Sequence, residues 1–275
     1  MSDVRRSISG AAAAERGPWE ANAFTMKRPD TAWQQAELAE LFTTCVRGGI
    51  PLAREQLDLI LRIVRRLVPN VQTVLDLGCG DGVLGRMLLS EYPQARCAFL
   101  DFSQPMLDLA RKAIARDGQE QRSQLLLADL GDAAWTKAVN PSHPFDVVLS
   151  GFCIHHQPDS QKRRIYKQVF ELLKPGGLFL NLEHVASTSQ WAHSLSEEFM
   201  IDSLYAHQQR LGKGMSREAV AAEWVHRADT QANILTGLDV QCAWLREAGF
   251  ADVDCFFKAL ELALFGGLKP VERSQ

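Results

Sequence analysis

The sequence of 275 residues predicts an α/β fold built on a doubly wound parallel β-sheet. Three observations support this prediction. Short apolar segments recur without polar alternation, as expected of strands that are buried on both faces of a sheet. Helical segments of about 10–15 residues separate these strands, which is the spacing of βαβ units. A glycine-rich turn, Gly78-Cys79-Gly80-Asp81-Gly82, directly follows the first strand.

The composition is that of an ordinary globular protein, with 46% apolar residues, 23% charged residues and a formal charge of -3. It excludes a disordered, collagen-like or coiled-coil chain, and the acidic balance argues against nucleic-acid binding. No apolar run reaches the ~18 residues that a membrane span needs, and the start lacks the apolar core of a signal peptide. The six cysteines show no spacing typical of zinc ligands. We therefore expect a cytoplasmic protein with free thiols, no membrane partner and no metal site.

The segments before the sheet differ in periodicity. Residues 1–30 combine Gly, Ala and charged residues without a period, so we expect a flexible N-terminus. Residues 31–70 are predicted to form cap helices, the first over Thr31–Val46 and the second from Pro51 to Leu67. In the second helix, apolar residues recur at spacings of three and four.

The predicted core, residues 71–186, contains five strands. They are Val74–Leu77, Cys97–Leu100, Leu125–Ala128, Phe145–Leu149 and Leu178–Leu182. Ser103, followed by Pro105, is predicted to cap one intervening helix. Another helix covers Ser160–Leu173, and we interpret its basic run Lys162–Arg164 as a solvated face.

Two further segments complete the predicted organisation. Residues 187–240 are polar and helical, and we expect them to form a lid over the sheet. Residues 241–275 are predicted to form the C-terminal part of the core. They include most of a helix predicted over Asp239–Ala248. Two final strands are predicted at Val253–Leu260 and Leu262–Phe265.

The glycine turn and three aspartates predict the ligand. Glycines let the backbone turn tightly beside a ligand, and Gly80-x-Gly82-x-x-Gly85 also fits the dinucleotide pattern. Asp76, inside the first strand, would repel a pyrophosphate but suits an ammonium group. Asp101 and Asp129 end the next two strands and suit a ribose diol and an adenine amine. An amine, a ribose and an adenine without phosphate describe S-adenosylmethionine better than a dinucleotide.

Five motifs in order resemble those of class I S-adenosylmethionine-dependent methyltransferases. They are Val74–Gly82, Asp101–Ser103 with Met106, Ala128–Leu130, Phe145–Val148 with Ile154–His156, and Leu172–Gly177. The resemblance covers about residues 71–185. It implies a Rossmann-like sheet of seven strands with an antiparallel terminal strand and a helical cap.

The resemblance also implies residue roles. Asp76 and Gly78 would lie near the methionine part of S-adenosylmethionine, and Phe102 and Leu130 would pack on the two sides of the adenine. The implied cofactor-binding residues are Asp76, Gly78, Gly80, Gly82, Asp101, Phe102, Met106, Asp129, Leu130 and Ser150.

Candidate catalytic residues follow the fourth and fifth strands. Transfer from an activated sulfonium needs mainly alignment, and a base is required only where the acceptor loses a proton. His155, His156 and Glu183 are the candidates. Two alternatives stay open: the histidines form a turn that bonds backbone carbonyls, and Glu183 contacts ligand or backbone.

The flanks are similar to those of carboxy-S-adenosylmethionine synthases, which make a carboxylated cofactor from S-adenosylmethionine and prephenate for tRNA wobble-uridine modification. On this resemblance, Trp33, Arg47, Tyr205 and Arg210 are candidate substrate residues, and Arg210 lies where the synthase holds the extra carboxylate. The loop Gly80-Asp81-Gly82 and the pair His155-His156 depart from the synthase pattern and favour ordinary methyl transfer.

We therefore predict an enzyme that transfers a methyl group from S-adenosylmethionine to a small-molecule acceptor and releases S-adenosylhomocysteine. The alternatives are synthase-like chemistry and a non-catalytic S-adenosylmethionine-binding protein. A nicotinamide dehydrogenase lacks a coherent hydride-transfer site here. The acceptor, the methylated atom and the oligomeric state, a homodimer included, stay open.

Overall fold

The computed structural model describes residues 29–139 and 144–271. The predicted flexible N-terminus therefore falls outside the described residues, except for its last two positions. The strands are β1 (Thr73–Leu77), β2 (Arg96–Asp101), β3 (Ser123–Leu127), β4 (Phe145–Gly151), β5 (Leu173–His184), β6 (Ala251–Ala259) and β7 (Leu262–Leu268). The α-helices are α1 (Ala36–Leu41), α2 (Ala53–Leu67), α3 (Val83–Glu91), α4 (Gln104–Arg116), α5 (Asp159–Leu172), α6 (Gln190–Arg210), α7 (Arg217–His226), α8 (Ala228–Gln231) and α9 (Leu238–Ala248). Short helical turns are η1 (Pro29–Gln34), η2 (Phe42–Val46), η3 (Arg47–Gly49), η4 (Glu120–Arg122), η5 (Trp135–Lys137) and η6 (Ile154–His156).

The seven strands form one sheet in the order β3-β2-β1-β4-β5-β7-β6. The first five pair in parallel, and β7 runs antiparallel to both β5 and β6. This confirms the predicted fold class, including the antiparallel terminal strand. The strand order reverses between β1 and β4, and open α/β sheets bind ligands in the crevice at such a switch point.

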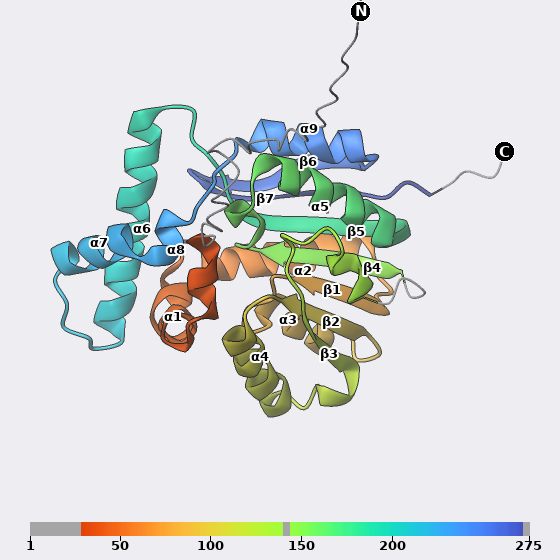
Figure 1. Cartoon of the computed structure of the whole chain (residues 1–275), viewed down its shortest axis with the longest axis horizontal. Coiled ribbons are helices and arrows are strands. Elements are labelled where there is room, and N and C mark those ends of the chain that lie inside the picture. The colour runs from red at the N-terminus through yellow and green to blue at the C-terminus, as the bar shows by residue number, and fades with distance from the viewer. Residues whose placement is uncertain (1–28, 140–143, 272–275) are drawn as a thin grey trace, which may run out of the picture.

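Helices cover both faces of the sheet (Figure 1), which explains why the central strands β1, β2 and β4 are almost continuously apolar and buried. Ile165 of α5 and Leu245 of α9 pack on one face with Leu75 and Leu77 of β1. Helices α2, α3 and α4 pack on the opposite face, where Ile60 and the other buried residues of that cluster lie. The doubly wound arrangement thus follows from a strand whose consecutive residues are all buried.

A helical cap covers one end of the sheet. Figure 1 shows α1, α6, α7 and α8 gathered beyond the end of the strands. Met200 and Leu204 of α6 and Val220 of α7 pack with Val46 of η2. The cluster also includes Leu262, the first residue of the antiparallel strand β7. The cap therefore lies over the carboxyl ends of the parallel strands, because β7 starts where β5 ends.

The prediction that Lys162 lies on a solvated face of α5 is wrong. Its side chain is fully buried, and Nζ donates to Asp159 Oδ1 at 3.2 Å, to Thr236 Oγ1 at 2.5 Å and to the Ile234 carbonyl. Arg163 is exposed and pairs with Glu247, as expected of a surface residue. Lys162 thus fastens the segment after α8 to α5.

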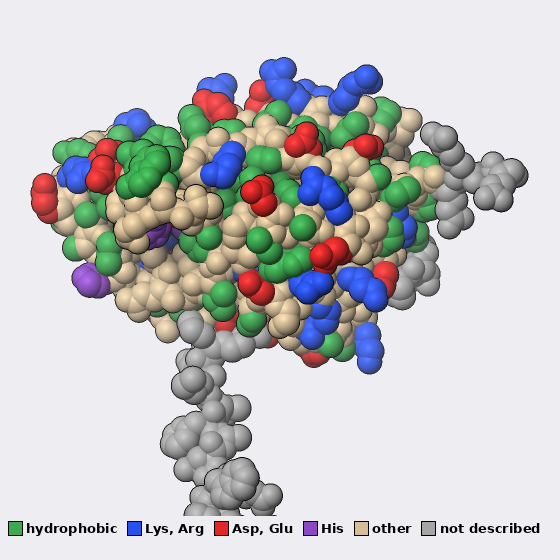
Figure 2. Space-filling view, turned by 90° about the horizontal axis from the view of Figure 1, so that it is seen from above, with side chains coloured by type: hydrophobic (Ala, Val, Ile, Leu, Met, Phe, Trp, Pro, Cys, Tyr) green, Lys and Arg blue, Asp and Glu red, His purple; other side chains and the backbone are tan. Residues whose placement is uncertain are grey.

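Within the described ranges, no helix combines the length and the apolar character that a membrane crossing requires. On the face that Figure 2 shows, basic and acidic side chains are interspersed and no broad basic surface forms.

Candidate active site

The glycine turn after β1 depends on backbone conformations that favour glycine. Gly78, Gly80 and Gly82 have φ angles of 60°, 55° and 80°. A Cβ atom on Gly78 would stand 2.0 Å from the sulfur of Cys153, so the loop touches the segment after β4. These glycines bring backbone close to the crevice at the switch point.

Two aspartates fix the loop and are themselves buried. Asp76 Oδ2 accepts a hydrogen bond from the backbone N–H of Gly85 at 2.8 Å, and burial raises the pKa of Asp76 to about 8. Asp101 accepts from the N–H groups of Gly80 and Ser103, each at 2.8 Å, and burial raises its pKa to about 6. Both carboxyls border a large cavity at the carboxyl ends of the parallel strands.

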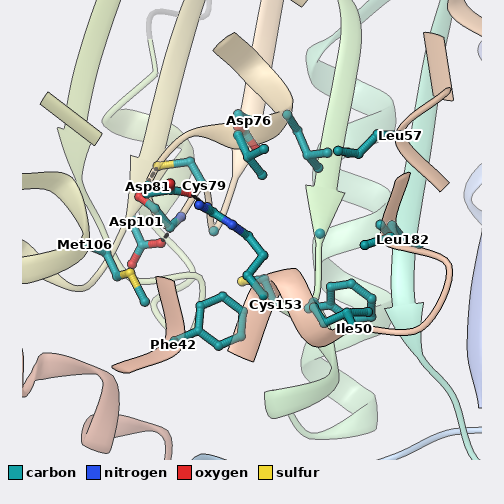
Figure 3. Close-up of a pocket in the computed structure, with 18 of the residues that line it drawn as sticks. Phe42, Ile50, Leu57, Asp76, Cys79, Asp81, Asp101, Met106, Cys153 and Leu182 are labelled. Atoms are coloured by element: carbon teal, nitrogen blue, oxygen red, sulfur yellow. Dashed lines mark hydrogen bonds and ion pairs between the residues drawn. The ribbon is translucent and has the colours of Figure 1, made fainter. Parts of the chain in front are cut away.

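A cavity of about 470 Å³ opens between the glycine turn, the ends of the strands and the N-terminal cap. In Figure 3, Asp76, Asp101 and Met106 lie to one side of this space, and Phe42 and Ile50 of the cap approach it from another. The sequence-predicted residues that line it are Asp76, Gly78, Gly80, Asp101, Phe102 and Met106 from the core, and Trp33, Arg47 and His156.

Four residues predicted to bind the cofactor do not line this cavity. Gly82 is the N-cap of α3. Asp129 accepts a hydrogen bond from the backbone N–H of Gly131 at 2.7 Å, and Leu130 is buried in the core. Ser150 is buried within β4, and its hydroxyl has no hydrogen-bond partner among the described residues. Its neighbour Gly151 lines the cavity instead.

An ion pair links the N-terminal cap to the glycine turn. The guanidinium of Arg47, on η3, contacts Asp81 Oδ1, and Arg86 approaches the other oxygen of Asp81 at 3.7 Å. Arg47 and Asp81 both line the cavity. The cap thereby places a cation on the edge of the cavity.

A smaller chamber, of about 60 Å³, adjoins the cavity under the lid. The two spaces share Trp33, Phe42, Ile50, Phe152 and His156. The other residues that line the chamber are Val46, His155, His184, Trp224, Arg227, Asp229, Thr230, Asn233 and Leu262. Phe152 has a φ of 50°, a strained conformation that is common at functional sites.

His155 and Glu183 form a buried dyad beside this chamber, because β4 and β5 are neighbours. His155 Nδ1 lies 2.5 Å from Glu183 Oε1. Glu183 also accepts from the backbone N–H groups of His155 and His184, at 3.1 and 2.9 Å. Burial raises the pKa of Glu183 to about 7 and holds the pKa of His155 well below its ordinary value. The other ring nitrogen of His155, Nε2, does not contact Glu183.

His156 is engaged differently. The indole N–H of Trp33 donates to His156 Nε2 at 3.2 Å, so this nitrogen holds a lone pair. Its Nδ1 lies 3.4 Å from the Ala232 carbonyl, and burial lowers the pKa of His156 to about 3. Both ring nitrogens of His156 are thus engaged within the protein, on the border of the two spaces.

The lid residues predicted from the flanks do not reach either space. Tyr205 packs within the cap, and Arg210 is exposed at the end of α6. Sequence reasoning missed Arg227, Thr230 and Asn233, because this stretch has no motif. The neighbouring Trp224 also lines the chamber and lies in the segment 187–240 that the sequence predicts to form the lid.

Comparisons with known proteins indicate a class for this site. Residues 74–177 match the family described as a methyltransferase domain. Over this range the chain is similar to class I S-adenosylmethionine-dependent methyltransferases. The matched range begins in β1 and ends in β5, and so holds the glycine turn and both cavity aspartates.

Relatives of this methyltransferase domain differ in how much of the chain they match. Carboxy-S-adenosyl-L-methionine synthase of Aeromonas hydrophila is 23% identical over 244 residues, which cover 87% of this chain and 91% of the relative. Demethylmenaquinone methyltransferase of Leptospira interrogans is 32% identical over 125 residues, 45% of this chain and 47% of the relative. Human N-acetylserotonin methyltransferase, solved in complex with SAM, has a similar fold, with a TM-score of 0.52 and 15% identity over 88% of this chain and 57% of that chain.

Proposed function

We propose that this protein transfers the methyl group of S-adenosylmethionine to a small-molecule acceptor that loses a proton. The observation that carries the proposal is the chamber beside the large cavity, with the His155–Glu183 dyad between the lid and the core. One space suits the cofactor and the other suits the acceptor. The lid that roofs the chamber would exclude water from the reaction.

The residues of the large cavity fit S-adenosylmethionine. A Cβ on Gly78 has no room, so backbone alone borders the cavity there. Asp76 is a buried carboxyl for an ammonium group, and Asp101 is a second one for the ribose hydroxyls. When bound, the cofactor supplies a methyl group on a positively charged sulfur, which is already activated for transfer.

His155 is the base of this proposal. A histidine that donates Nδ1–H to a carboxylate presents Nε2 as a proton acceptor, and Glu183 fixes this tautomer and stabilises the imidazolium. The low pKa of His155 keeps the imidazole neutral at neutral pH. Glu183 acts as a positioning residue, because its carboxyl is behind the ring and fully buried.

Synthase-like chemistry is the second candidate, since the similarity to the synthase covers most of both chains. It requires a cation for the extra carboxylate. Arg210 is exposed and lines neither of the two spaces, and Arg227 is paired with Asp229. The smaller chamber, as the described residues line it, therefore offers no unpaired cation for that carboxylate, while Arg47, paired with Asp81, and Arg54 border the large cavity.

The direct test follows a labelled methyl group. The protein is incubated with methyl-deuterated S-adenosylmethionine and a diverse library of small molecules, and products are identified by mass spectrometry. We expect S-adenosylhomocysteine together with one deuteromethylated product. His155→Asn is expected to lower the rate by about 10²–10⁴-fold and to leave affinity for S-adenosylhomocysteine unchanged. A carboxylated adenosyl product with prephenate would establish the synthase chemistry, and binding without turnover of any acceptor would establish a non-catalytic protein.

The pH dependence provides a second readout for the dyad. The rate of methyl transfer is expected to decrease as the pH falls below about 7. The dyad then takes up a proton, because the pKa of Glu183 is about 7, and the protonated dyad cannot accept the proton of the acceptor. Glu183→Gln should remove this step and lower the maximal rate. An unchanged pH profile in Glu183→Gln would exclude the dyad as the base.

A further inference from the structure

We infer that the lid, the helical segment 187–240, is fastened at its start by a pH-sensitive clamp that loosens as the pH rises above neutrality. The clamp consists of His184, His193 and Glu261. The inference goes beyond the proposed function, because it concerns how the lid is held and not which acceptor reacts. It is carried by the hydrogen bonds of Glu261, the sparse packing of the first turns of α6 and a second, buried anchor at the other end of the lid.

Glu261 joins three separate elements of the fold. It lies in the turn between β6 and β7 and is 2% exposed. Its Oε2 accepts a hydrogen bond from His184 Nε2, at the end of β5, at 3.0 Å. Its Oε1 accepts from His193 Nδ1 of α6 at 3.0 Å and from the backbone N–H of Ser187, where the lid starts, at 3.2 Å. An ionised carboxylate can only accept, so both histidine nitrogens carry a proton.

The charge of His193 responds to pH in this clamp. Its hydrogen bond to Glu261 raises the pKa of His193 above the ordinary histidine value, and Glu197, 3.8 Å from Nε2, acts in the same direction. Burial raises the pKa of Glu261, but the three hydrogen bonds that it accepts lower it to about 2, so this carboxylate stays charged. The clamp is therefore an ion pair below about pH 6.5 and loses its charge as the pH rises through the raised pKa of His193.

A second titrating pair lies behind the clamp. The His184 ring is 5.9 Å from the ring of His155, whose Nδ1 contacts Glu183, and the pKa of Glu183 is about 7. These two residues belong to η6 and β5, and neither of them contacts His193. Replacement of His193 alone therefore separates the clamp from this pair.

The first turns of α6 depend on the clamp because little else covers them. Trp191 and Leu195 are 71% and 43% exposed, and the first buried residue of the helix is Ser196. Only farther along do Met200 and Leu204 pack with the apolar residues of the cap. Segments with few buried apolar contacts open locally at low cost in free energy. Loss of charge at His193 should therefore release the start of α6 before the rest of the lid.

The other end of the lid is held by a buried group. Lys162 Nζ donates to Thr236 Oγ1 at 2.5 Å and to the Ile234 carbonyl. His193, in contrast, is 40% exposed in its side chain. The lid is thus fixed where it returns to the core and held by a titrating, accessible group where it leaves the core. Because His184 also lines the chamber, the clamp lies next to the space that the lid covers.

Hydrogen exchange followed by mass spectrometry tests the clamp on the ligand-free full chain. Exchange of the backbone amides of residues 190–197, corrected for its intrinsic pH dependence, is compared at about pH 6 and about pH 8. We expect this segment to open about three- to fivefold more often at the higher pH. His193→Asn places an uncharged N–H donor near the position of Nδ1 and should give the faster exchange at both pH values. Equal corrected exchange of the unmodified protein at both pH values, or a pH dependence that persists in His193→Asn, would overturn the inference.

A matched control and an independent readout complete the test. His226, exposed at the end of α7, is a lid histidine outside the clamp, and His226→Asn should retain the pH dependence of residues 190–197. Its loss in this control would contradict the assignment to His193. NMR titration of the His193 imidazole should give a pKa above about 6.5 that decreases in Glu261→Gln. A His193 pKa at or below the ordinary value would also contradict the clamp. If Glu261→Gln does not fold, the exchange of His193→Asn decides.

Discussion

Two aspartates of the large cavity show how burial and neighbouring groups set a residue's proton affinity. Burial raises the pKa of Asp76 to about 8 and that of Asp101 only to about 6. Asp76 accepts one backbone N–H and is repelled by the nearby carboxyls of Asp101 and Asp81, whereas Asp101 accepts several backbone N–H groups, each of which stabilises its charged form. Asp76 is therefore protonated at neutral pH until a cation approaches.

Cofactor binding should release a proton from Asp76. An ammonium group beside this carboxyl lowers its pKa, so binding of S-adenosylhomocysteine at pH 7 is expected to release up to about one proton. Calorimetry in two buffers of different ionisation enthalpy measures this number. Asp76→Asn should abolish the release. A release that persists in Asp76→Asn would show that the proton comes from another group.

At the scale of elements, α5 shows the limit of pattern reasoning. The run Lys162–Arg164 is a plausible solvated face from its neighbours in sequence, but Lys162 is covered by a segment more than seventy residues later. Burial lowers the pKa of Lys162, and Asp159 offsets part of this effect. The lysine holds the segment that leads from Asn233 in the chamber back to the core.

Removal of this lysine should destabilise the fold. Lys162→Met leaves the Ile234 carbonyl and the Thr236 hydroxyl without their donor, so we expect a loss of about 1–3 kcal/mol in the free energy of unfolding. Arg163→Met, on the exposed side of the same helix, should change it by less than about 0.5 kcal/mol. Urea unfolding of the two variants makes the comparison. Equal stability of both would contradict the role of Lys162.

Elements whose contacts are local in sequence or dictated by strand order were predictable. The glycine turn and Asp101 follow directly from strand ends, and β4 beside β5 brings His155 to Glu183. Residues of the lid were not predictable, because Thr230 and Asn233 enter the site through packing of short helices that carry no motif. Asp129 follows the end of β3 and is predicted from the sequence to bind the adenine amine, yet the large cavity does not extend to it.

For the molecule as a whole, burial of acids at the crevice couples stability to pH. The raised pKa values of Asp76 and Glu183 mean that the folded protein binds more protons than the unfolded chain near neutral pH. His193, whose pKa is raised by Glu261, acts in the same direction. The lowered pKa values of His155 and His156 act mainly below about pH 6.5, where unfolded histidines take up protons.

Stability of the ligand-free protein should therefore decrease as pH rises from about 6.5 to 8. We expect the free energy of unfolding to fall by about 1–3 kcal/mol over this range. Asp76→Asn should reduce the slope, because the amide does not titrate. Urea unfolding at several pH values measures the effect. A stability that rises with pH in this window would contradict the protonation states assigned to the crevice.

We propose that the two adjoining spaces are the cofactor and acceptor halves of one active site. A crystal structure of the complex with S-adenosylhomocysteine would locate the cofactor half. We expect the adenosyl group in the large cavity, the ribose at Asp101, and the sulfur at the border formed by Phe152 and His156. A ligand whose sulfur points away from the chamber, or one bound outside the large cavity, would contradict the claim.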